Sequence, residues 1–591
     1  MRKLFLAALL ALMAFAPAQA SPAGDLASLV KDYDEAQLVL YPSTALWRGD
    51  RRYLDKYEDD LSAAHLAERR KENTEFRARL SGIDRAQLDA EDQLSYDIFA
   101  YNLADDAGAL APGLGEHFQM LPLDQFNGNH VSFAVEMEWR SRFPFNTVAD
   151  YESAISRMNG FAHWIDTAIA RMHEGEALGI TQPRVIVERM IPQAEEQANK
   201  SVEDSVFYGP VKNMPDTIKG DDRARITKEY RATVGDVVIP AYRRLANFLK
   251  DEYLPRARPS VGLEAMPGGS EMYLYLARHH TTLERTPAEI HAIGLAEVKR
   301  IAGEMERVKN QTGFKGDLPA FRAFLRNDPQ FKFKDEAQML AAYKAVKAKI
   351  ASGLPRLFDS QPNTPYEIKF FPDFVAPTQA AAQYNQPSED GSRPGIFYIN
   401  GYDLPSRPTY STEVLSLHES MPGHHMQIAL SMENTALPAF RRFNGPTAFV
   451  EGWGLYTESL GKGLGLYTDP YQQFAQLSFD MWRACRLVVD TGLHAQGMTR
   501  EQAIDYMLAN TSLTKTDVTA EVERYIAYPG QALAYKSGQL ELFKLRDDAK
   551  AALGAKFDIR KFHDAVLMDG AMPLSILDGK IHRWIAQQSR Y

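Results

Sequence analysis

The chain has 591 residues, of which 45% are hydrophobic and 24% are charged, and its formal net charge is −10 at pH 7. This is the composition of a globular protein, and an acidic chain is not suited to nucleic acid or to an anionic membrane surface. The single cysteine, Cys485, excludes an intramolecular disulfide bond. It lies in a predicted helix, and we expect a buried, inert thiol.

The first twenty residues predict a cleavable secretory signal. Arg2 and Lys3 precede an almost wholly apolar stretch, and Ala18-Gln19-Ala20 has the small-residue pattern of a cleavage site. We therefore expect residues 1–20 to be removed and the protein to be periplasmic or secreted. No cysteine lies beside the cut, which does not favour lipoprotein processing, and a buried N-terminal helix is the alternative. No later run is apolar and long enough to cross a bilayer, so we expect no membrane insertion.

Helical periodicity dominates the rest of the chain. Thr286 to Glu289 forms a capping box with proline in the first turn, and Thr499 with Gln502 begins another helix in the same way. A long amphipathic helix is predicted by apolar residues that recur at three- and four-residue steps, namely Tyr151, Ile155, Met158, Phe161, Ile165, Ile169 and Met172.

Strand signals are few, and they cluster just before a histidine-rich segment. Tyr366 to Phe371 and Ile396 to Ile399 are rich in aromatic and β-branched residues, and the second run is bounded by Pro-Gly and Asn-Gly turns. The sequence therefore predicts a mainly α protein with a small β-sheet. A loose division near residue 285 separates an N-terminal helical half, 21–285, from a C-terminal half, 286–591, which carries the chemistry.

The histidine-rich segment contains His418, Glu419, His424 and His425 at the end of a helix that begins near Ser411. Zinc peptidases commonly place H-E-x-x-H on one helix, so that both histidines reach one metal ion and the glutamate takes a proton from the metal-bound water. Here the second histidine stands six or seven positions after His418. On an unbroken helix, six steps turn through about 600° and seven steps climb about 10.5 Å, so neither histidine would reach the same ion.

Pro422 and Gly423 change that conclusion. Proline disrupts the helical hydrogen bonds and glycine permits unusual backbone angles, so a local break can return one histidine to the metal. Glycine directly before the ligand favours His424, whereas the residues that follow favour His425. The sequence leaves both open as metal ligands.

A site with two histidines needs a third protein ligand and an open position for water. Glu451 is the best candidate, because Pro446 predicts the start of a second helix just before it. Glu458, seven residues later on the same face, either orients a histidine ligand or forms an ordinary salt bridge. The donor set points to zinc, although another divalent ion remains an alternative.

The motifs that these residues form, H-E-x-x-P-G-H-H from His418 and E-G-W-x-L-Y-x-E from Glu451, resemble those of a large bacterial family of unknown function, grouped with gluzincin-like zinc metallopeptidases. The segments Asp390 to Gly395 and Tyr528 to Ala532 also resemble recurring parts of that family, and the resemblance covers most of the mature chain. More distantly, the chain is similar to angiotensin-converting enzyme, thimet oligopeptidase and Taq-type carboxypeptidases. The resemblance implies a large helical body split by a deep active-site channel, with a small β-sheet next to the metal-binding helix.

The resemblance also implies roles for particular residues. Glu419 would be the general base and later the proton donor. The candidates for the group that stabilises the oxyanion are Tyr528, Tyr535 and His494, and the two tyrosines are favoured over the histidine.

Substrate-binding residues are implied less directly. The strand that carries Tyr398 is compared with an edge strand that pairs with the substrate backbone, the alternative being an ordinary structural strand. Arg393, Arg486, Arg524 and Lys536 are candidates to anchor a peptide carboxylate, and an ordinary surface or supporting charge is the alternative for each.

Three functions are compatible with this sequence. The first is a zinc peptidase that hydrolyses short peptides. The second is a zinc-dependent hydrolase of another amide, such as a modified amino acid. The third is a non-catalytic binding protein on a peptidase fold, for which loss of the base would be typical, yet Glu419 is present. Cleavage mode, side-chain preference and oligomeric state do not follow from the sequence.

Overall fold

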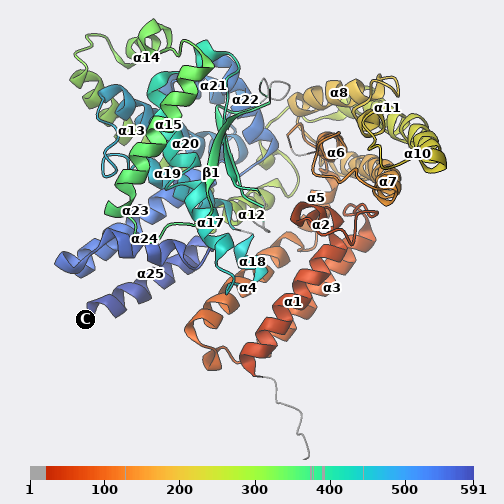
Figure 1. Ribbon diagram of the computed structural model, residues 1–591, viewed down its shortest axis with the longest axis horizontal. Helices are drawn as coiled ribbons and strands as arrows, with labels where there is room; N and C mark the ends of the chain where they lie inside the picture. Colours follow the sequence, from red (N-terminus) through yellow and green to blue (C-terminus); the bar gives the residue numbers. More distant parts are fainter. Residues whose placement is uncertain are drawn as a thin grey trace, which may run out of the picture.

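In the computed structural model, the described residues are 21–126, 128–372, 376, 379–388, 393–443 and 445–590. The predicted signal, 1–20, lies outside them, as do Asp390, Gly391 and Ser392 of one family-like segment. The prediction of a mainly α fold with a small sheet is confirmed, since three strands accompany a long series of helices (Figure 1). In the described part of the chain, no helix has the length and hydropathy needed to span a membrane.

The described residues of the N-terminal part form helices joined by loops, and the three strands all lie in the C-terminal part (Figure 1). The predicted stripe of apolar residues belongs to α7, which a capping box of Thr147 and Asp150 begins, and its residues Tyr151, Met158 and Ile165 are fully buried. The α-helices are α1 Pro22–Leu40, α2 Pro42–Arg48, α3 Ala63–Ser81, α4 Ala90–Ala109, α5 Leu114–Met120, α6 Asn129–Glu136, α7 Val148–Leu178, α8 Arg184–Ala198, α9 Gly209–Lys212, α10 Gly220–Thr233, α11 Ile239–Asn247 and α12 Gly269–Thr281.

The C-terminal part begins with α13, which has the predicted capping box of Thr286 and Glu289. The second predicted box, Thr499 with Gln502, begins α21. The α-helices of this part are α13 Pro287–Gln311, α14 Leu318–Asn327, α15 Glu336–Gly353, α16 Thr412–Glu419, α17 His424–Glu433, α18 Ala439–Arg442, α19 Thr447–Glu458, α20 Pro470–Ala495, α21 Arg500–Asn510, α22 Lys515–Ala527, α23 Leu533–Leu553, α24 Ile559–Leu567 and α25 Leu574–Ser589.

The sheet has three strands, β1 Tyr366–Phe370, β2 Ala382–Asn385 and β3 Gly395–Ile399, in the order β1-β3-β2. The central strand, β3, runs parallel to β1, with Tyr366 beside Gly395, and antiparallel to β2, with Ala382 beside Ile399. The expectation of a substrate-pairing edge strand at Ile396–Ile399 is therefore wrong, because the hydrogen-bonding groups on both sides of β3 are used within the sheet.

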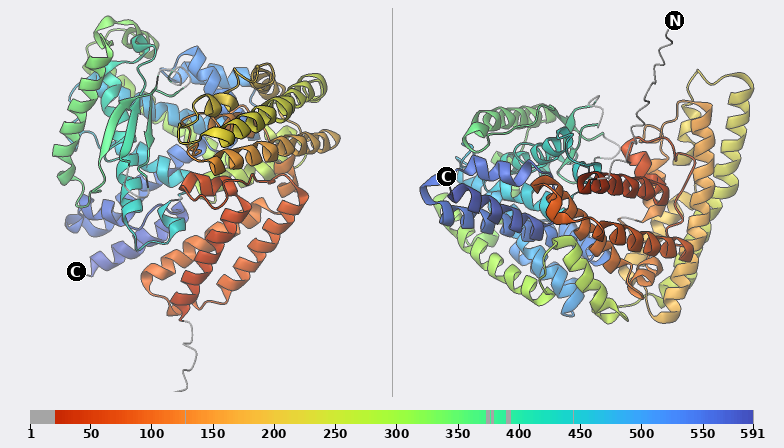
Figure 2. Two further views of the ribbon diagram at one scale, coloured as in Figure 1. Left: turned by 45° about the vertical axis from the view of Figure 1, so that its right-hand side comes forward. Right: turned by 90° about the horizontal axis from the view of Figure 1, so that it is seen from below.

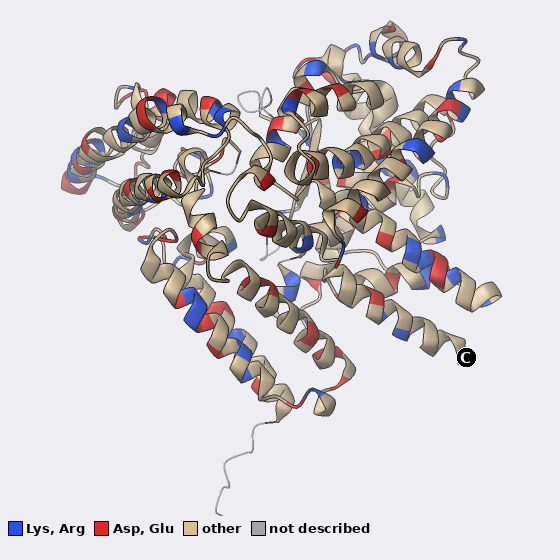
Figure 3. Cartoon of the chain, turned by 180° about the vertical axis from the view of Figure 1, so that it is seen from behind, with Lys and Arg blue, Asp and Glu red and all other residues tan. Residues whose placement is uncertain are grey.

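Two large hydrophobic clusters hold the molecule together. One joins α7, α8, α10 and α11 to α13, α20 and α22, and the other joins α1, α3 and α4 to the sheet, α16, α19 and the C-terminal helices. Each cluster contains residues from both sides of position 285, so burial of apolar surface ties the two halves together. Figure 2 shows α1 and α3 packed beneath the body, and Figure 3 shows acidic and basic residues interspersed along the helices.

Candidate metal centre

The candidate metal-binding segment consists of two helices separated by a tight break. α16 ends at Glu419 and α17 begins at His424, which confirms the predicted interruption at Pro422-Gly423. The break folds back on the end of α16, because a Cβ atom at Gly423 would lie 1.9 Å from the carbonyl oxygen of His418. Only glycine avoids this overlap. The backbone therefore requires glycine immediately before the second histidine.

The break brings His424 back to His418, and α19 adds Glu451. Nε2 of His418 lies 3.4 Å from Oε2 of Glu451, and Nε2 of His424 lies 3.6 Å from the same oxygen. One ligand atom from each of the three residues lies within 4.8 Å of the other two. Zinc with bonds of 2.0–2.1 Å in tetrahedral geometry requires ligand atoms about 3.3 Å apart. The donor types and their spacing therefore fit one zinc ion.

His425 is turned away from this cluster. Its Nδ1 accepts a hydrogen bond from the hydroxyl of Tyr384 at 2.8 Å, and its Nε2 donates to the carbonyl of Thr364 at 3.0 Å. The ring also packs against Tyr366, with centroids 4.7 Å apart. Both nitrogens are thus occupied on the sheet side of α17. Of the two alternatives that the sequence left open, the geometry favours His424, and metal binding by either residue stays a prediction.

Glycines on α19 allow the close approach of three helices. A Cβ atom at Gly454 would lie 2.8 Å from Cε1 of His418, so the imidazole sits directly on the α19 backbone. A Cβ atom at Gly452 would lie 2.5 Å from Cα of Gly538 on α23. Backbone contact of this kind fixes the distance between α16, α19 and α23. Glu451 is held at the imidazoles by helix packing.

Two further side chains of α19 fix α16 and the break. Oε1 of Glu458 lies 2.9 Å from Nδ1 of His418, which sets the tautomer that presents Nε2 to the cluster. The same oxygen also lies 3.7 Å from a terminal guanidinium nitrogen of Arg483, so Glu458 both contacts the histidine and forms a salt bridge. The indole of Trp453 donates to the carbonyl of Pro422 at 2.8 Å and so holds the break in place. Sequence analysis did not assign Trp453 a role, although it lies between the two acids of the motif.

The charges of the cluster are strongly coupled. Burial alone would lower the pKa of His418, but its bonds to Glu451 and Glu458 and the charge of Glu419 outweigh burial and raise that pKa to about 10. Burial would raise the pKa of Glu451, yet the bonds to His418 and His424 hold it well below its usual value. Three carboxylates around two imidazoles favour a cation at this place. The side chain of Glu451 is still 21% exposed, so the cluster is open on one side.

The two tyrosine candidates have different charged neighbours. Burial raises the pKa of Tyr535, and the charge of Glu451 adds to the effect. Burial also raises the pKa of Tyr528, and the charge that adds to this effect is that of Asp124. The ring of Tyr528 packs edge-on against that of His280, with centroids 5.2 Å apart. His494 is fully buried and bonds the backbone of Leu263 and Tyr525, which is a structural environment.

The other predicted residues are spread over the molecule. Tyr398 stacks on Phe371 with centroids 5.0 Å apart, and the backbone of exposed Arg393 bonds Ser388. Lys536 is fully buried with Asp480 and Glu297 at 2.7 and 2.9 Å, which makes it a structural ion pair. Arg486 and Arg524 share the carboxylate of Glu521. Cys485 is buried as expected, and burial raises the pKa of its thiol to about 12.

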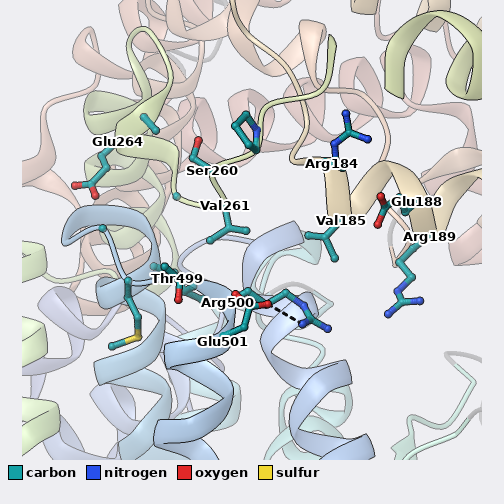
Figure 4. Close-up of a pocket in the computed structure, with 16 residues that line it drawn as sticks. Arg184, Val185, Glu188, Arg189, Ser260, Val261, Glu264, Thr499, Arg500 and Glu501 are labelled. Atoms are coloured by element: carbon teal, nitrogen blue, oxygen red, sulfur yellow. Dashed lines mark hydrogen bonds and ion pairs between the residues drawn. The ribbon is translucent and has the colours of Figure 1, made fainter. Parts of the chain in front are cut away.

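A separate cavity of 570 Å³ lies between α8, residues 259–265 and the start of α21 (Figure 4). Its lining residues include three arginines and three glutamates, namely Arg184, Arg189, Arg500, Glu188, Glu264 and Glu501. None of the candidate site residues lines it, so its size does not make it the reaction site.

The fold and the cluster together define a large, mainly α-helical protein with a two-histidine, one-glutamate site beside a small sheet. The chain belongs to DUF885, a family of bacterial proteins of unknown function, whose model matches residues 42–581. No curated protein matches the chain.

Two solved structures are similar to this chain. One is a candidate lipoprotein from Colwellia psychrerythraea, with 29% sequence identity and a TM-score of 0.87 over 96% of this chain and 100% of that one. The other is a candidate lipoprotein of unknown function from Shewanella oneidensis, with 18% identity and a TM-score of 0.76 over 94% of this chain and 99% of that one. The second likeness shows the fold alone.

Proposed function

We propose that this protein is a zinc-dependent peptidase that hydrolyses short peptides. The observation that carries the proposal is the convergence of His418, His424 and Glu451, with nitrogen-to-oxygen distances of 3.4 and 3.6 Å, next to the carboxylate of Glu419. Two imidazoles and one carboxylate with an exposed side are the donor set of catalytic zinc sites. When bound there, zinc supplies Lewis-acid chemistry, since it acidifies water and polarises a carbonyl group.

The chain's own residues would then divide the work. His418 and His424 present Nε2, and Glu458 keeps His418 in the required tautomer from Nδ1. Glu419 follows His418 directly and is only partly buried, so its carboxylate is available to take a proton from water and return it to the leaving amine. Tyr535 is the better candidate to donate a hydrogen bond to the oxyanion, because its hydroxyl is within the electrostatic influence of Glu451.

We also propose that the protein acts outside the cytoplasm, in the periplasm or after secretion. The support is the signal-like sequence of residues 1–20, together with the description of the Colwellia protein as a candidate lipoprotein.

The test begins with the metal content of the purified protein. We expect about one zinc ion per chain, lost or sharply weakened in His418→Ala and Glu451→Gln. A peptide library is then incubated with the zinc-loaded protein, and Glu419→Gln serves as the control that keeps the metal ligands and removes the base. Cleavage that depends on Glu419 supports the proposal. Failure to bind zinc offered at neutral pH would refute it and favour a binding protein, whereas zinc binding without peptide cleavage would favour another amide as substrate.

A further inference from the structure

A second cavity, of 200 Å³, lies between α14, α15, the segment 406–411 and α20. Its walls are largely aromatic and aliphatic, with Phe333, Tyr343, Leu415, Phe479 and Trp482 among the lining residues. Sites for drug-sized ligands usually measure about 300–1,000 Å³. This cavity is smaller, so it suits one bulky apolar amino-acid residue.

The charged residues that line the cavity are all basic. Three arginines line it, Arg322, Arg326 and Arg407, and the described lining residues include no aspartate or glutamate. The cavity of Figure 4 has a glutamate for each arginine and is balanced in comparison. The cavity beside α20 therefore has cationic groups without matching acids.

The hydrogen bonds of these arginines leave donors free. Among the described residues, their hydrogen-bond acceptors are backbone carbonyls, of Ala509 for Arg322, Ser512 for Arg326 and Tyr402 for Arg407. Arg322 is only 6% exposed, and its Nε is buried without a hydrogen-bond partner. A buried guanidinium is stabilised when an anion pairs with it. The arginines of the lining thus lack an anionic partner, which a bound ligand could supply.

The cavity lies about one helical turn from the proposed general base. Leu415 lines it and lies four residues before Glu419 on α16, so the two side chains share one face of that helix. Tyr343 of α15 also lines the cavity; its burial raises the pKa of its hydroxyl, and the charge of Glu419 raises it further. A ligand in the cavity would therefore lie about one helical turn from Glu419.

We propose that this cavity binds the carboxyl-terminal residue of the peptide substrate. An aromatic or large aliphatic side chain would occupy the apolar walls, and the terminal carboxylate would pair with the arginines. This inference deepens the proposed peptidase function and rests on it, since it makes the enzyme a carboxypeptidase for peptides that end in a bulky apolar residue.

The test measures binding and does not depend on turnover. The full mature chain carrying Glu419→Gln is titrated by calorimetry with N-acetyl-L-phenylalanine, its amide and N-acetylglycine. A hydrogen bond to a charged group contributes about 1.5–3 kcal/mol, so we expect the acid to bind at least about tenfold more tightly than its amide. It should also bind at least about tenfold more tightly than N-acetylglycine, because glycine leaves the apolar walls unfilled.

Two substitutions locate the binding. Arg407→Gln should weaken the acid about tenfold and leave the amide unchanged. Ser478→Phe, which places a ring in the cavity, should abolish binding of the acid. The matched control is Arg356→Gln, because Arg356 also bonds a backbone carbonyl at the surface, that of Gly463 at 3.4 Å, and does not line the cavity.

Undetectable binding of the acid, equal binding of acid and amide, or insensitivity to Arg407→Gln would overturn the inference. Zinc content and peptide cleavage, measured on the protein with Glu419 intact, distinguish failure of the peptidase proposal from failure of the carboxylate-binding inference. If the protein binds zinc and cleaves peptides but does not bind the acid more tightly than its amide, the inference alone fails. If the acid binds selectively but the protein holds no zinc, the peptidase proposal fails and the cavity remains a carboxylate site.

Discussion

Adjacent histidines with opposite surroundings give the sharpest prediction about the site. His424 faces His418 and Glu451, whereas His425 is bonded on both nitrogens to Tyr384 and Thr364. Replacement of His424 by alanine should therefore remove a metal ligand, and replacement of His425 by alanine should remove structural bonds. The two variants serve as controls for each other.

The magnitudes follow from the contacts. The free energy of zinc binding by four ligands in small domains is about 10–16 kcal/mol, which is about 3 kcal/mol for each ligand. His424→Ala should therefore weaken the affinity for zinc at least about 100-fold. His425→Ala leaves the Tyr384 hydroxyl and the Thr364 carbonyl without their partner, and each loss costs about 1–3 kcal/mol. We therefore expect the free energy of unfolding to fall by about 2–6 kcal/mol in that variant.

Two assays separate these outcomes. Zinc affinity is measured by competition with a chromophoric chelator, and stability is measured by urea denaturation of the metal-free protein. We expect His424→Ala to lose affinity with a small change in stability, and His425→Ala to lose stability and keep its zinc. The opposite pattern, with zinc retained in His424→Ala and lost in His425→Ala, would refute the assignment of the cluster.

Three further predictions concern the surroundings of the cluster. Glu458→Gln should weaken zinc binding about 10–100-fold, because the partner of His418 Nδ1 loses its charge, and an unchanged chelator titration would contradict this. Gly423→Ala should remove zinc binding, since its Cβ would lie 1.9 Å from a carbonyl oxygen of α16, and wild-type affinity would show that the break tolerates a side chain. Burial lowers the pKa of His563 to about 4, so the unfolded chain takes up the proton first, and this residue alone should reduce the free energy of unfolding by up to about 3 kcal/mol as the pH drops from about 6.5 to about 4. The buried residues His130, His280, His425 and His494 have lowered pKa values for the same reason and add to the fall. Urea denaturation at pH 7 and pH 4.5 should show a smaller fall in His563→Gln than in the wild type, and an equal fall would rule out His563 as a contributor.

Local signals in the sequence were sufficient for much of the fold. The capping boxes at Thr286 and Thr499 begin helices, the apolar stripe through Tyr151 is the buried face of α7, and Pro422-Gly423 interrupts the candidate metal-binding segment. These features depend on hydrogen bonds and side-chain spacing within a few residues, which is why the sequence alone reveals them.

Contacts between distant segments were decided only by the tertiary structure. The sequence placed His424 and His425 on equal terms, and the choice depends on Thr364 and Tyr384, about forty to sixty residues away, which occupy His425. Likewise, Ile396–Ile399 reads as a strand, but its central place follows from pairing with β1 and β2 on both sides. The residue types that can bind a metal are thus written in the sequence, whereas which of them meet is set by the packing of α16, α17 and α19 through glycines that admit no side chain.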